Sequence, residues 1–259
     1  MSVVALLAAV GVVVLGIVSW RLHTEAARLR RRVQETAGDL EDLRRSFSRF
    51  APDQVIERVI ADGVRHRGEK KDVTVLFADI VEFTALSERL DPDVLVRVLN
   101  GYFERMSRVI SEHRGFVSTF VGDGILALFG ALAPNPWQAN DAVHAALGMR
   151  AALAEYNREL DAEGLLPLSI GVGVQRGPAV AGLVGSSELM QFTCVGRAVN
   201  MAARVQALTR QYPADVILTD AVAAELDPRF TLRPLPATPV KGIREPLVVF
   251  AADGFDGGR

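Results

Sequence analysis

The distribution of hydrophobic and polar residues divides the chain into three stretches. Residues 2–20, SVVALLAAVGVVVLGIVSW, contain no charged side chain. From residue 21 to residue 50, apolar residues recur at steps of four and three among many Arg and Glu residues. From about residue 71 to residue 252, short apolar runs alternate with amphipathic stretches, which is typical of a domain built from strands and helices.

The first stretch predicts a transmembrane helix over residues 1–20, because a helix needs about 20 apolar residues to span a bilayer. Arg21 follows immediately, and further arginines occupy positions 28, 30, 31 and 32. A secretory signal would carry its positive charge before the apolar run rather than after it. The basic flank predicts a single-pass anchor in the lipid bilayer of the cell (inner) membrane, with the remaining chain in the cytoplasm. The alternative is a helix buried in a soluble protein.

The second stretch, residues 21–50, predicts a coiled-coil stalk. Its apolar seam consists of Leu22, Ala26, Leu29, Val33, Thr36, Leu40, Leu43, Phe47 and Phe50. Such a seam lets two parallel helices pack together, so the stalk predicts a homodimer. The alternative is a single amphipathic helix that lies on the protein's own domain or on lipid. Residues 51–70 are expected to form a short connecting helix, beginning near Pro52, and a linker.

Residues 71–252 predict one α/β domain, followed by a loose tail over residues 253–259. The order β-α-β-β-α-β indicates a palm-like or ferredoxin-like α/β sandwich with extra C-terminal strands. The second and third strands flank Gly122-Asp123-Gly124, which predicts a tight hairpin. Strands are expected at 72–81, 116–121, 125–129, 166–174, 179–184 and 191–195, and helices at 91–114, 137–160 and 197–211.

Composition excludes several classes of protein. With 259 residues, of which 49% are hydrophobic, the chain can bury a substantial core. A formal net charge of -2 gives no general attraction to phosphate backbones, so nucleic acid is not an expected partner. The single cysteine, Cys194, excludes an internal disulfide, and the four histidines form no HExxH pair, which argues against a zinc hydrolase. Neither a P-loop nor a GxGxxG fingerprint occurs.

Two aspartates are candidates for metal ligands. Asp79 ends an otherwise apolar strand, where an unpaired carboxylate would be costly, although it could equally cap the following turn. Asp123 lies at the tip of the predicted hairpin, where the turn alone would explain an aspartate. If the hairpin adjoins the first strand, the two carboxylates form an oxygen-rich site that suits Mg²⁺ or Mn²⁺ rather than Zn²⁺. Two such ions can support phosphoryl transfer.

Another candidate is the predicted helix that contains Val199-Asn200-Met201-Ala202-Ala203-Arg204. Asn200 and Arg204 are four residues apart, so their side chains lie on one helical face. An amide and a guanidinium on that face could hold a sugar and a phosphate. By spacing alone, a solvent-exposed polar stripe is the better explanation of the pair.

Five segments in a fixed order resemble the successive motifs of the class III nucleotidyl cyclases. Together they extend from Phe77 to Pro246, so the resemblance covers most of the predicted domain. The segments are FADIVEFTALSERLDP (77–92), FVGDGILALFG (120–130), GVGVQRGPAVAGLVG (171–185), FTCVGRAVNMAARV (192–205) and VKGIREP (240–246).

The resemblance implies a role for each matching residue near the first strand. Asp79 and Asp123 match the two aspartates that bind metal in this family, and the Ile80 carbonyl matches a further ligand. Two Mg²⁺ or Mn²⁺ ions per site are therefore expected. The loop through Phe83 and Thr84 matches the one whose main-chain amides hold the terminal phosphates.

The remaining matches imply the reaction and the assembly. Asn200 and Arg204 match the pair that orients the ribose and stabilises charge on the α-phosphate, and Lys241 matches a lysine that binds the polyphosphate. The family reaction is attack of the ribose 3′-oxygen on the α-phosphate, which gives a 3′,5′-cyclic nucleotide and pyrophosphate. Family sites form between two catalytic domains, and one chain here holds both residue sets, so a homodimer with two equivalent sites is implied.

The purine-selecting positions depart from the family pattern. Adenine-selective members usually carry Lys where this chain has Thr119, whereas Thr193, at the partner position, is compatible with adenine. Thr119 is shorter than Lys and uncharged, so it cannot reach a purine acceptor as Lys would. The expected activity is an adenylate cyclase that uses ATP. The alternatives are a guanylate or mixed-purine cyclase that uses GTP, and a catalytically weakened nucleotide-binding module for signalling or dimerisation.

Overall fold

The computed structural model describes residues 68–186, 188–239 and 246–257, together with scattered positions between residues 16 and 55. The chain divides into two units, residues 1–60 and 61–259. Most of the predicted anchor (1–20) and connecting segment (51–70) lies outside the described residues. Among the residues that are described, no helix is both long enough and apolar enough to cross a membrane.

The described positions between residues 20 and 38 are helical and exposed. Within this helix the Thr36 hydroxyl donates to the Arg32 carbonyl at 2.8 Å, a contact one helical turn long. Pairing of this helix with a second copy in a coiled coil stays a prediction, because the described residues belong to one chain.

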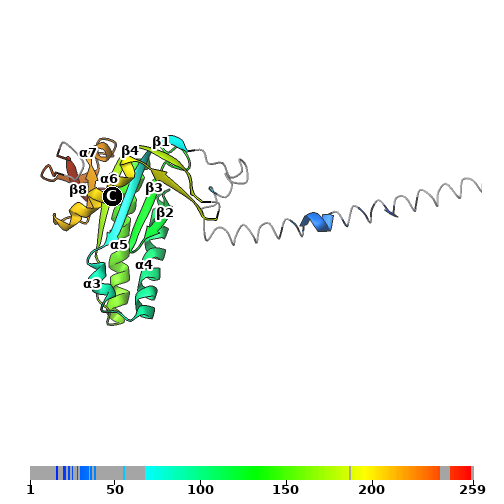
Figure 1. The fold of residues 1–259 in the computed structure, drawn as a ribbon, viewed down its shortest axis with the longest axis horizontal. Helices are drawn as coiled ribbons and strands as arrows, with labels where there is room; N and C mark the ends of the chain where they lie inside the picture. The colour runs from blue at the N-terminus through cyan, green and yellow to red at the C-terminus, as the bar shows by residue number, and fades with distance from the viewer. Residues whose placement is uncertain are drawn as a thin grey trace, which may run out of the picture. The chain divides into compact units, whose positions relative to one another are not determined.

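The second unit contains a sheet of eight strands among its described residues (Figure 1). The order across the sheet is β2-β3-β1-β4-β6-β8-β7, and β5 pairs with β4 beside this path. β4 and β6 run parallel, whereas the other pairs are antiparallel. The strands are β1 (Glu69–Ile80), β2 (Phe116–Val121), β3 (Gly124–Phe129), β4 (Ile170–Gly185), β5 (Met190–Val195), β6 (Val216–Thr219), β7 (Phe230–Pro234) and β8 (Val249–Phe255).

Helices pack on both faces of this sheet. On β6, Val216 and Leu218 join the core beneath α4 and α5, whereas Ile217 packs with α6, as the alternation of side chains along a strand requires. Gly173 of β4 allows α6 to lie close to the sheet, because a Cβ atom there would overlap the α6 backbone. The helices are α3 (Phe83–Ser87), α4 (Pro92–Glu112), α5 (Gln138–Ala162), α6 (Arg197–Ala207) and α7 (Asp220–Ala223), and a 3-10 turn, η1 (Leu208–Arg210), follows α6.

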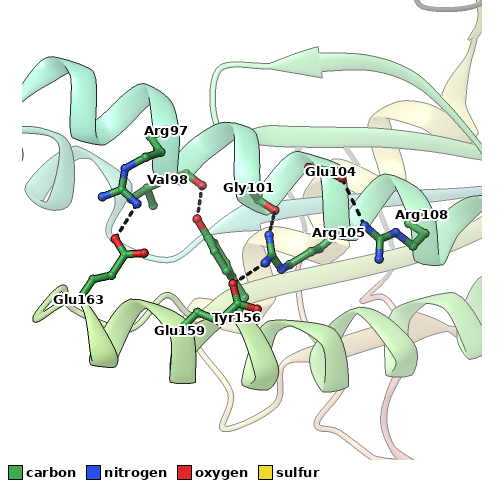
Figure 2. Close-up of polar contacts among 9 residues, drawn as sticks. All are labelled: Arg97, Val98, Gly101, Glu104, Arg105, Arg108, Tyr156, Glu159 and Glu163. Atoms are coloured by element: carbon green, nitrogen blue, oxygen red, sulfur yellow. Dashed lines mark hydrogen bonds and ion pairs between the residues drawn. The ribbon is translucent and has the colours of Figure 1, made fainter.

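Polar contacts join α4 to α5 along their partly exposed sides (Figure 2). The Tyr156 hydroxyl of α5 donates to the Val98 carbonyl of α4 at 3.0 Å. Arg105 of α4 pairs with Glu159, and its guanidinium lies 4.2 Å from the centre of the Tyr156 ring. These contacts fix the register of the two helices that cover the core.

The predicted α/β sandwich with its β-α-β-β-α-β order is confirmed in β1, α4, β2, β3, α5 and β4. Several element boundaries differ from the prediction, and two of these differences change how the strands are delimited. The strands expected at 166–174 and 179–184 are one continuous strand, β4, because Gln175–Pro178 stay paired with β1. β8 extends to Phe255, whose ring packs against Phe230, so the segment predicted as a tail from residue 253 begins within a strand.

Candidate functional site

The structure brings Asp79 and Asp123 together at one end of the sheet. Asp79 is the penultimate residue of β1, and Asp123 lies in the two-residue turn that joins β2 to β3. Because β3 pairs with β1, this turn lies beside the end of β1. One carboxylate oxygen of Asp123 accepts a hydrogen bond of 3.1 Å from the Ile80 main-chain N–H. Gly122 adopts a φ of 63°, which favours glycine and lets the hairpin turn sharply.

Burial dominates the electrostatics of this pair. Burial, the hydrogen bond between the two carboxyl groups and the charge of Asp123 together raise the pKa of Asp79 to about 6, and burial contributes most. Two carboxylates this close cannot both ionise without cost, unless a cation lies between or beside them. The pair therefore has the composition of a binding site for a hard cation.

Arg210 supplies a positive charge to this site in the described structure. Its guanidinium donates to an Asp79 carboxylate oxygen at 3.0 Å and lowers the Asp79 pKa, although less than burial and Asp123 raise it. Arg210 ends η1, and Gly171, the β4 residue paired with Asp79, has no Cβ to obstruct Thr209 of the same turn. The sheet thus lets the end of η1 approach the carboxylate.

Tyr102 lies in the core near the two carboxylates. It is fully buried on α4, and its hydroxyl has no hydrogen-bond partner among the described residues. Burial raises the pKa of Tyr102 strongly, and the charges of Asp79 and Asp123 raise it further. The phenol therefore stays protonated and can donate a hydrogen bond.

The donor set fits a divalent cation such as Mg²⁺. Such ions are bound through one or two carboxylates, with water and substrate phosphates completing the shell. Asp79 and Asp123 supply the two carboxylates, and Ile80, whose main-chain N–H binds Asp123, follows Asp79 directly in sequence. Within the described ranges no cluster of three or more His, Cys, Asp or Glu side chains could enclose a metal, so the protein would supply only part of the shell.

The residues predicted to hold phosphate follow β1 directly. Phe83 and Thr84 begin α3, after Glu82 in a left-handed conformation with a φ of 56°. Phe83 packs against the core, whereas Thr84 is exposed. Thr84 therefore lies at the surface within five residues of Asp79 in sequence.

Asn200 and Arg204 lie on α6, as predicted, and within the described chain no hydrogen bond or ion pair joins either of them to Asp79 or Asp123. Asn200 is exposed and Arg204 is half-buried. Neither side chain makes a hydrogen bond or ion pair within the part of the chain that the structure describes. Lys241, the other predicted phosphate ligand, lies outside the described residues.

The two predicted purine-selecting residues lie on neighbouring strands. Thr119 is on β2, and its hydroxyl donates to the Phe120 carbonyl at 3.2 Å. Thr193 is on β5, and its hydroxyl oxygen lies 2.9 Å from the hydroxyl oxygen of Ser118. The β2 and β5 strands do not pair, so this side-chain contact connects them.

Three residues near these sites were missed from the sequence. Tyr102 lies four residues from Val98 and four from Met106 on the buried face of α4, so the sequence pattern predicts an ordinary core residue there. Arg210 falls after the end of a helix, where a basic residue is common. Ser118 lies in a β-bulge, and no local pattern predicts its direction.

Comparisons with known proteins agree with this arrangement. The model of the adenylate and guanylate cyclase catalytic domain matches residues 66–253. An adenylate cyclase of Anabaena cylindrica is 33% identical over 216 residues, which are 79% of this chain and 42% of that protein. The chain therefore spans less than half the length of this relative.

Two solved structures have the same fold. A guanylyl cyclase crystal structure is 33% identical, has a TM-score of 0.68, and shares 73% of this chain and 95% of its own. The adenylyl cyclase CyaB from P. aeruginosa is 27% identical, has a TM-score of 0.70, and shares 74% of this chain and 98% of its own.

Proposed function

Because the chain belongs to the family of adenylate and guanylate cyclase catalytic domains, we propose that it converts ATP to 3′,5′-cyclic AMP and pyrophosphate. The ribose 3′-oxygen attacks the α-phosphorus, and the bond from that phosphorus to the bridging oxygen of the leaving pyrophosphate breaks. The observation that carries this proposal is the convergence of Asp79 and Asp123 beside the end of β1.

Asp79, Asp123 and the Ile80 carbonyl would hold two Mg²⁺ or Mn²⁺ ions. When bound, such ions favour deprotonation of the attacking hydroxyl and neutralise the leaving pyrophosphate. The chain's own contribution is preorganisation: the Ile80 N–H fixes the Asp123 carboxylate before any ligand binds. The main-chain N–H groups of Phe83 and Thr84, which begin α3, would hold the terminal phosphates.

The second half of each site would come from another copy of the chain. Asn200 would orient the ribose, Arg204 would stabilise charge on the α-phosphate, and Lys241 would bind the polyphosphate. The lack of partners for Asn200 and Arg204 within the described chain supports this division, because polar groups that serve a ligand need no internal partner. A homodimer would then contain two equivalent sites.

The β4–β5 hairpin is the surface that would contact the second copy. Val180 and Val195 form a directly paired position on this hairpin, and both are exposed. Val184 and Leu189 add exposed apolar area towards its tip. Clustered apolar side chains at a surface favour burial against a partner. The stalk over residues 21–50 would hold two such domains close together, and residues 1–20 would anchor them in the cell membrane, with the catalytic domain in the cytoplasm.

A second candidate function is a guanylate or mixed-purine cyclase. It is favoured by Thr119, which cannot act as the usual lysine, and by the 33% identity to a guanylyl cyclase structure. A third is a module that binds nucleotide without turnover. Asp79, Asp123, Asn200, Arg204 and Lys241 are all present, and this argues against a degenerate site, since a module without turnover has no evident need for all five.

The test uses the purified full chain with Mn²⁺ and either ATP or GTP. We expect the 3′,5′-cyclic nucleotide and pyrophosphate in equal amounts, with faster turnover of ATP. Asp79→Ala should abolish turnover, whereas Asp253→Ala, which also removes an aspartate paired with an arginine, should not. Nucleotide binding without turnover would favour the module, and faster turnover of GTP would favour the guanylate cyclase.

A further inference from the structure

Ser118 occupies an irregular position next to the predicted purine-reading residue. β2 and β3 pair at Val117 with Ala127 and at Thr119 with Leu126, so Ser118 is the extra residue of a β-bulge. A bulge turns a side chain away from the direction that regular alternation gives it. Ser118 is nearly fully buried, and its hydroxyl lies against β5.

Three hydrogen bonds hold the bulge against β5. The Ser118 hydroxyl oxygen lies 3.1 Å from the Phe192 carbonyl oxygen and 2.9 Å from the Thr193 hydroxyl oxygen. The Gln191 side-chain amide donates to the Ser118 carbonyl. The bulge is therefore connected to three consecutive residues of β5, and the Ser118 hydroxyl is the group that meets Thr193.

Counting protons restricts what this contact can do. A serine hydroxyl has a single hydrogen, so Ser118 can donate to Phe192 or to Thr193, but not fully to both. If Ser118 donates to the Phe192 carbonyl, Thr193 can donate to Ser118 and keep its outer lone pairs free as an acceptor. If Ser118 donates to Thr193, the Thr193 hydrogen is free to be donated outward, and the Phe192 carbonyl loses this partner.

We propose that Ser118 is a specificity-positioning residue, which sets whether Thr193 accepts from or donates to the purine ring. The inference rests on the proposed function, in which Thr193 faces the base. Adenine presents an amino donor at its 6-position, and guanine presents an oxygen acceptor there. The accepting state of Thr193 therefore fits ATP, and the donating state fits GTP.

The two states are unequal. With ATP, the hydrogen bonds run in one direction, from the 6-amino group to Thr193, from Thr193 to Ser118 and from Ser118 to the Phe192 carbonyl. Each hydroxyl hydrogen then has an acceptor. With GTP, the Phe192 carbonyl is left without the Ser118 hydrogen. One neutral hydrogen bond corresponds to roughly a three- to tenfold preference. The Ser118–Thr193 pair would thus permit binding of both purine nucleotides and favour ATP by about this factor, although Thr119 stands where adenine-selective members usually carry Lys.

The experiment compares the ratio of kcat/KM for ATP to that for GTP in the full chain. This ratio does not depend on the fraction of protein that is folded, so partial loss of stability in a variant leaves it unchanged. Ser118→Ala should lower the ratio about three- to tenfold, because Thr193 then accepts only by leaving its own hydrogen without the Ser118 acceptor. Ser118→Thr, which keeps the hydroxyl, should restore most of the ratio. Ser111→Ala, at an exposed serine of α4, is the matched control and should not change it.

The effect of Ser118→Ala is also measured in the variant Thr193→Val. In this variant the hydroxyl that Ser118 controls is absent, so adding Ser118→Ala should not change the ratio further. A merely structural role of Ser118 would instead give a common loss for both nucleotides and an unchanged ratio, and this result would overturn the inference. So would an equal effect of Ser118→Ala in the two backgrounds.

A failure of the proposed function is separable from a failure of this inference. If no cyclic nucleotide forms, the same variants are compared by the dissociation constants of 3′-deoxy-ATP and 3′-deoxy-GTP, which lack the attacking oxygen. A Ser118-dependent binding ratio would then support the inference although the cyclase proposal had failed. An unchanged binding ratio, or binding of neither nucleotide, would overturn it.

Discussion

Two aspartate–arginine pairs in this domain have similar lengths and opposite electrostatics. Arg210 lies 3.0 Å from Asp79, and Arg229 lies 2.9 Å from Asp227. The hydrogen bonds from Arg229 lower the pKa of Asp227 to about 2. Burial and the neighbouring Asp123 raise the pKa of Asp79 to about 6, in spite of Arg210. An arginine partner thus does not by itself make an aspartate part of a stabilising surface ion pair. Burial and the second carboxylate together distinguish the Asp79 site from an ordinary salt bridge.

The largest expected effect comes from exchanging each aspartate for asparagine. Asp79→Asn should lower cyclase turnover about 1,000-fold or more, because it removes a charged ligand from the proposed metal site. Asp227→Asn, the matched control, should change turnover less than about twofold, because surface pairs contribute little. The measurement is cyclic nucleotide formed per minute at saturating Mn²⁺. Turnover of Asp79→Asn within tenfold of the unchanged chain would exclude Asp79 as a metal ligand.

The pH dependence of stability should differ in sign between the two pairs. Folded Asp79 binds its proton more tightly than the unfolded chain does, so the free energy of unfolding should fall as pH rises from about 4 to 6. Folded Asp227 binds its proton more weakly than the unfolded chain does. The stabilisation that its ion pair with Arg229 provides should therefore be lost as pH falls from about 4 to 2.

Denaturant unfolding of the unchanged chain and of Asp79→Asn between pH 4 and pH 8 tests the first sign. Between pH 4 and pH 6, the free energy of unfolding of Asp79→Asn should rise by about 1 kcal/mol relative to that of the unchanged chain. Above pH 7 this difference should not grow further. A difference that is constant with pH would show that Asp79 does not titrate in this window.

Removing each arginine should affect cation binding at only one of the pairs. Arg210→Gln should tighten Mn²⁺ binding about three- to tenfold, because the guanidinium competes for the Asp79 carboxylate when no metal is bound. Arg229→Gln should leave Mn²⁺ affinity unchanged. Calorimetric titration with Mn²⁺ alone measures both, and weaker binding by Arg210→Gln would instead make the arginine a support for the site.

The smallest expected effect concerns Tyr102. Tyr102→Phe removes a buried hydroxyl that lacks a partner among the described residues, and keeps the ring that fills the core. The free energy of unfolding without metal should rise by about 1 kcal/mol. A loss of stability would show that the hydroxyl donates to Asp79 or Asp123 in solution.

Sequence reasoning reached the carboxylates because the two aspartates, each with an ordinary explanation of its own, point to a metal site when they are considered together. An aspartate at the end of an apolar strand is costly unless it is used, and an aspartate in a two-residue hairpin has a known position relative to the paired strands. The strand order then brought Asp79 and Asp123 together. The order of strands and helices could also be predicted, because the period of the apolar residues differs between helices and strands.

The contacts that shape the site were beyond such reasoning. Arg210 reaches Asp79 only because Gly171 lets η1 approach the sheet, which is a property of two segments far apart in sequence. Ser118 meets Thr193 only because β2 is irregular there, and nothing in FVSTFV specifies a bulge. Side-chain convergence of this kind depends on packing between elements, whereas sequence patterns report each element separately.

The unbroken course of β4 has a mechanical consequence. One strand of 16 residues, about 50 Å long at 3.3 Å per residue, places Gly171 opposite Asp79 and also bears the exposed valines at Val180 and Val184. No loop lies between these two regions to absorb a displacement. A displacement of the hairpin would therefore be transmitted along the backbone to the residues that pair with the end of β1, so the proposed dimer surface and the proposed metal site are mechanically coupled through one strand.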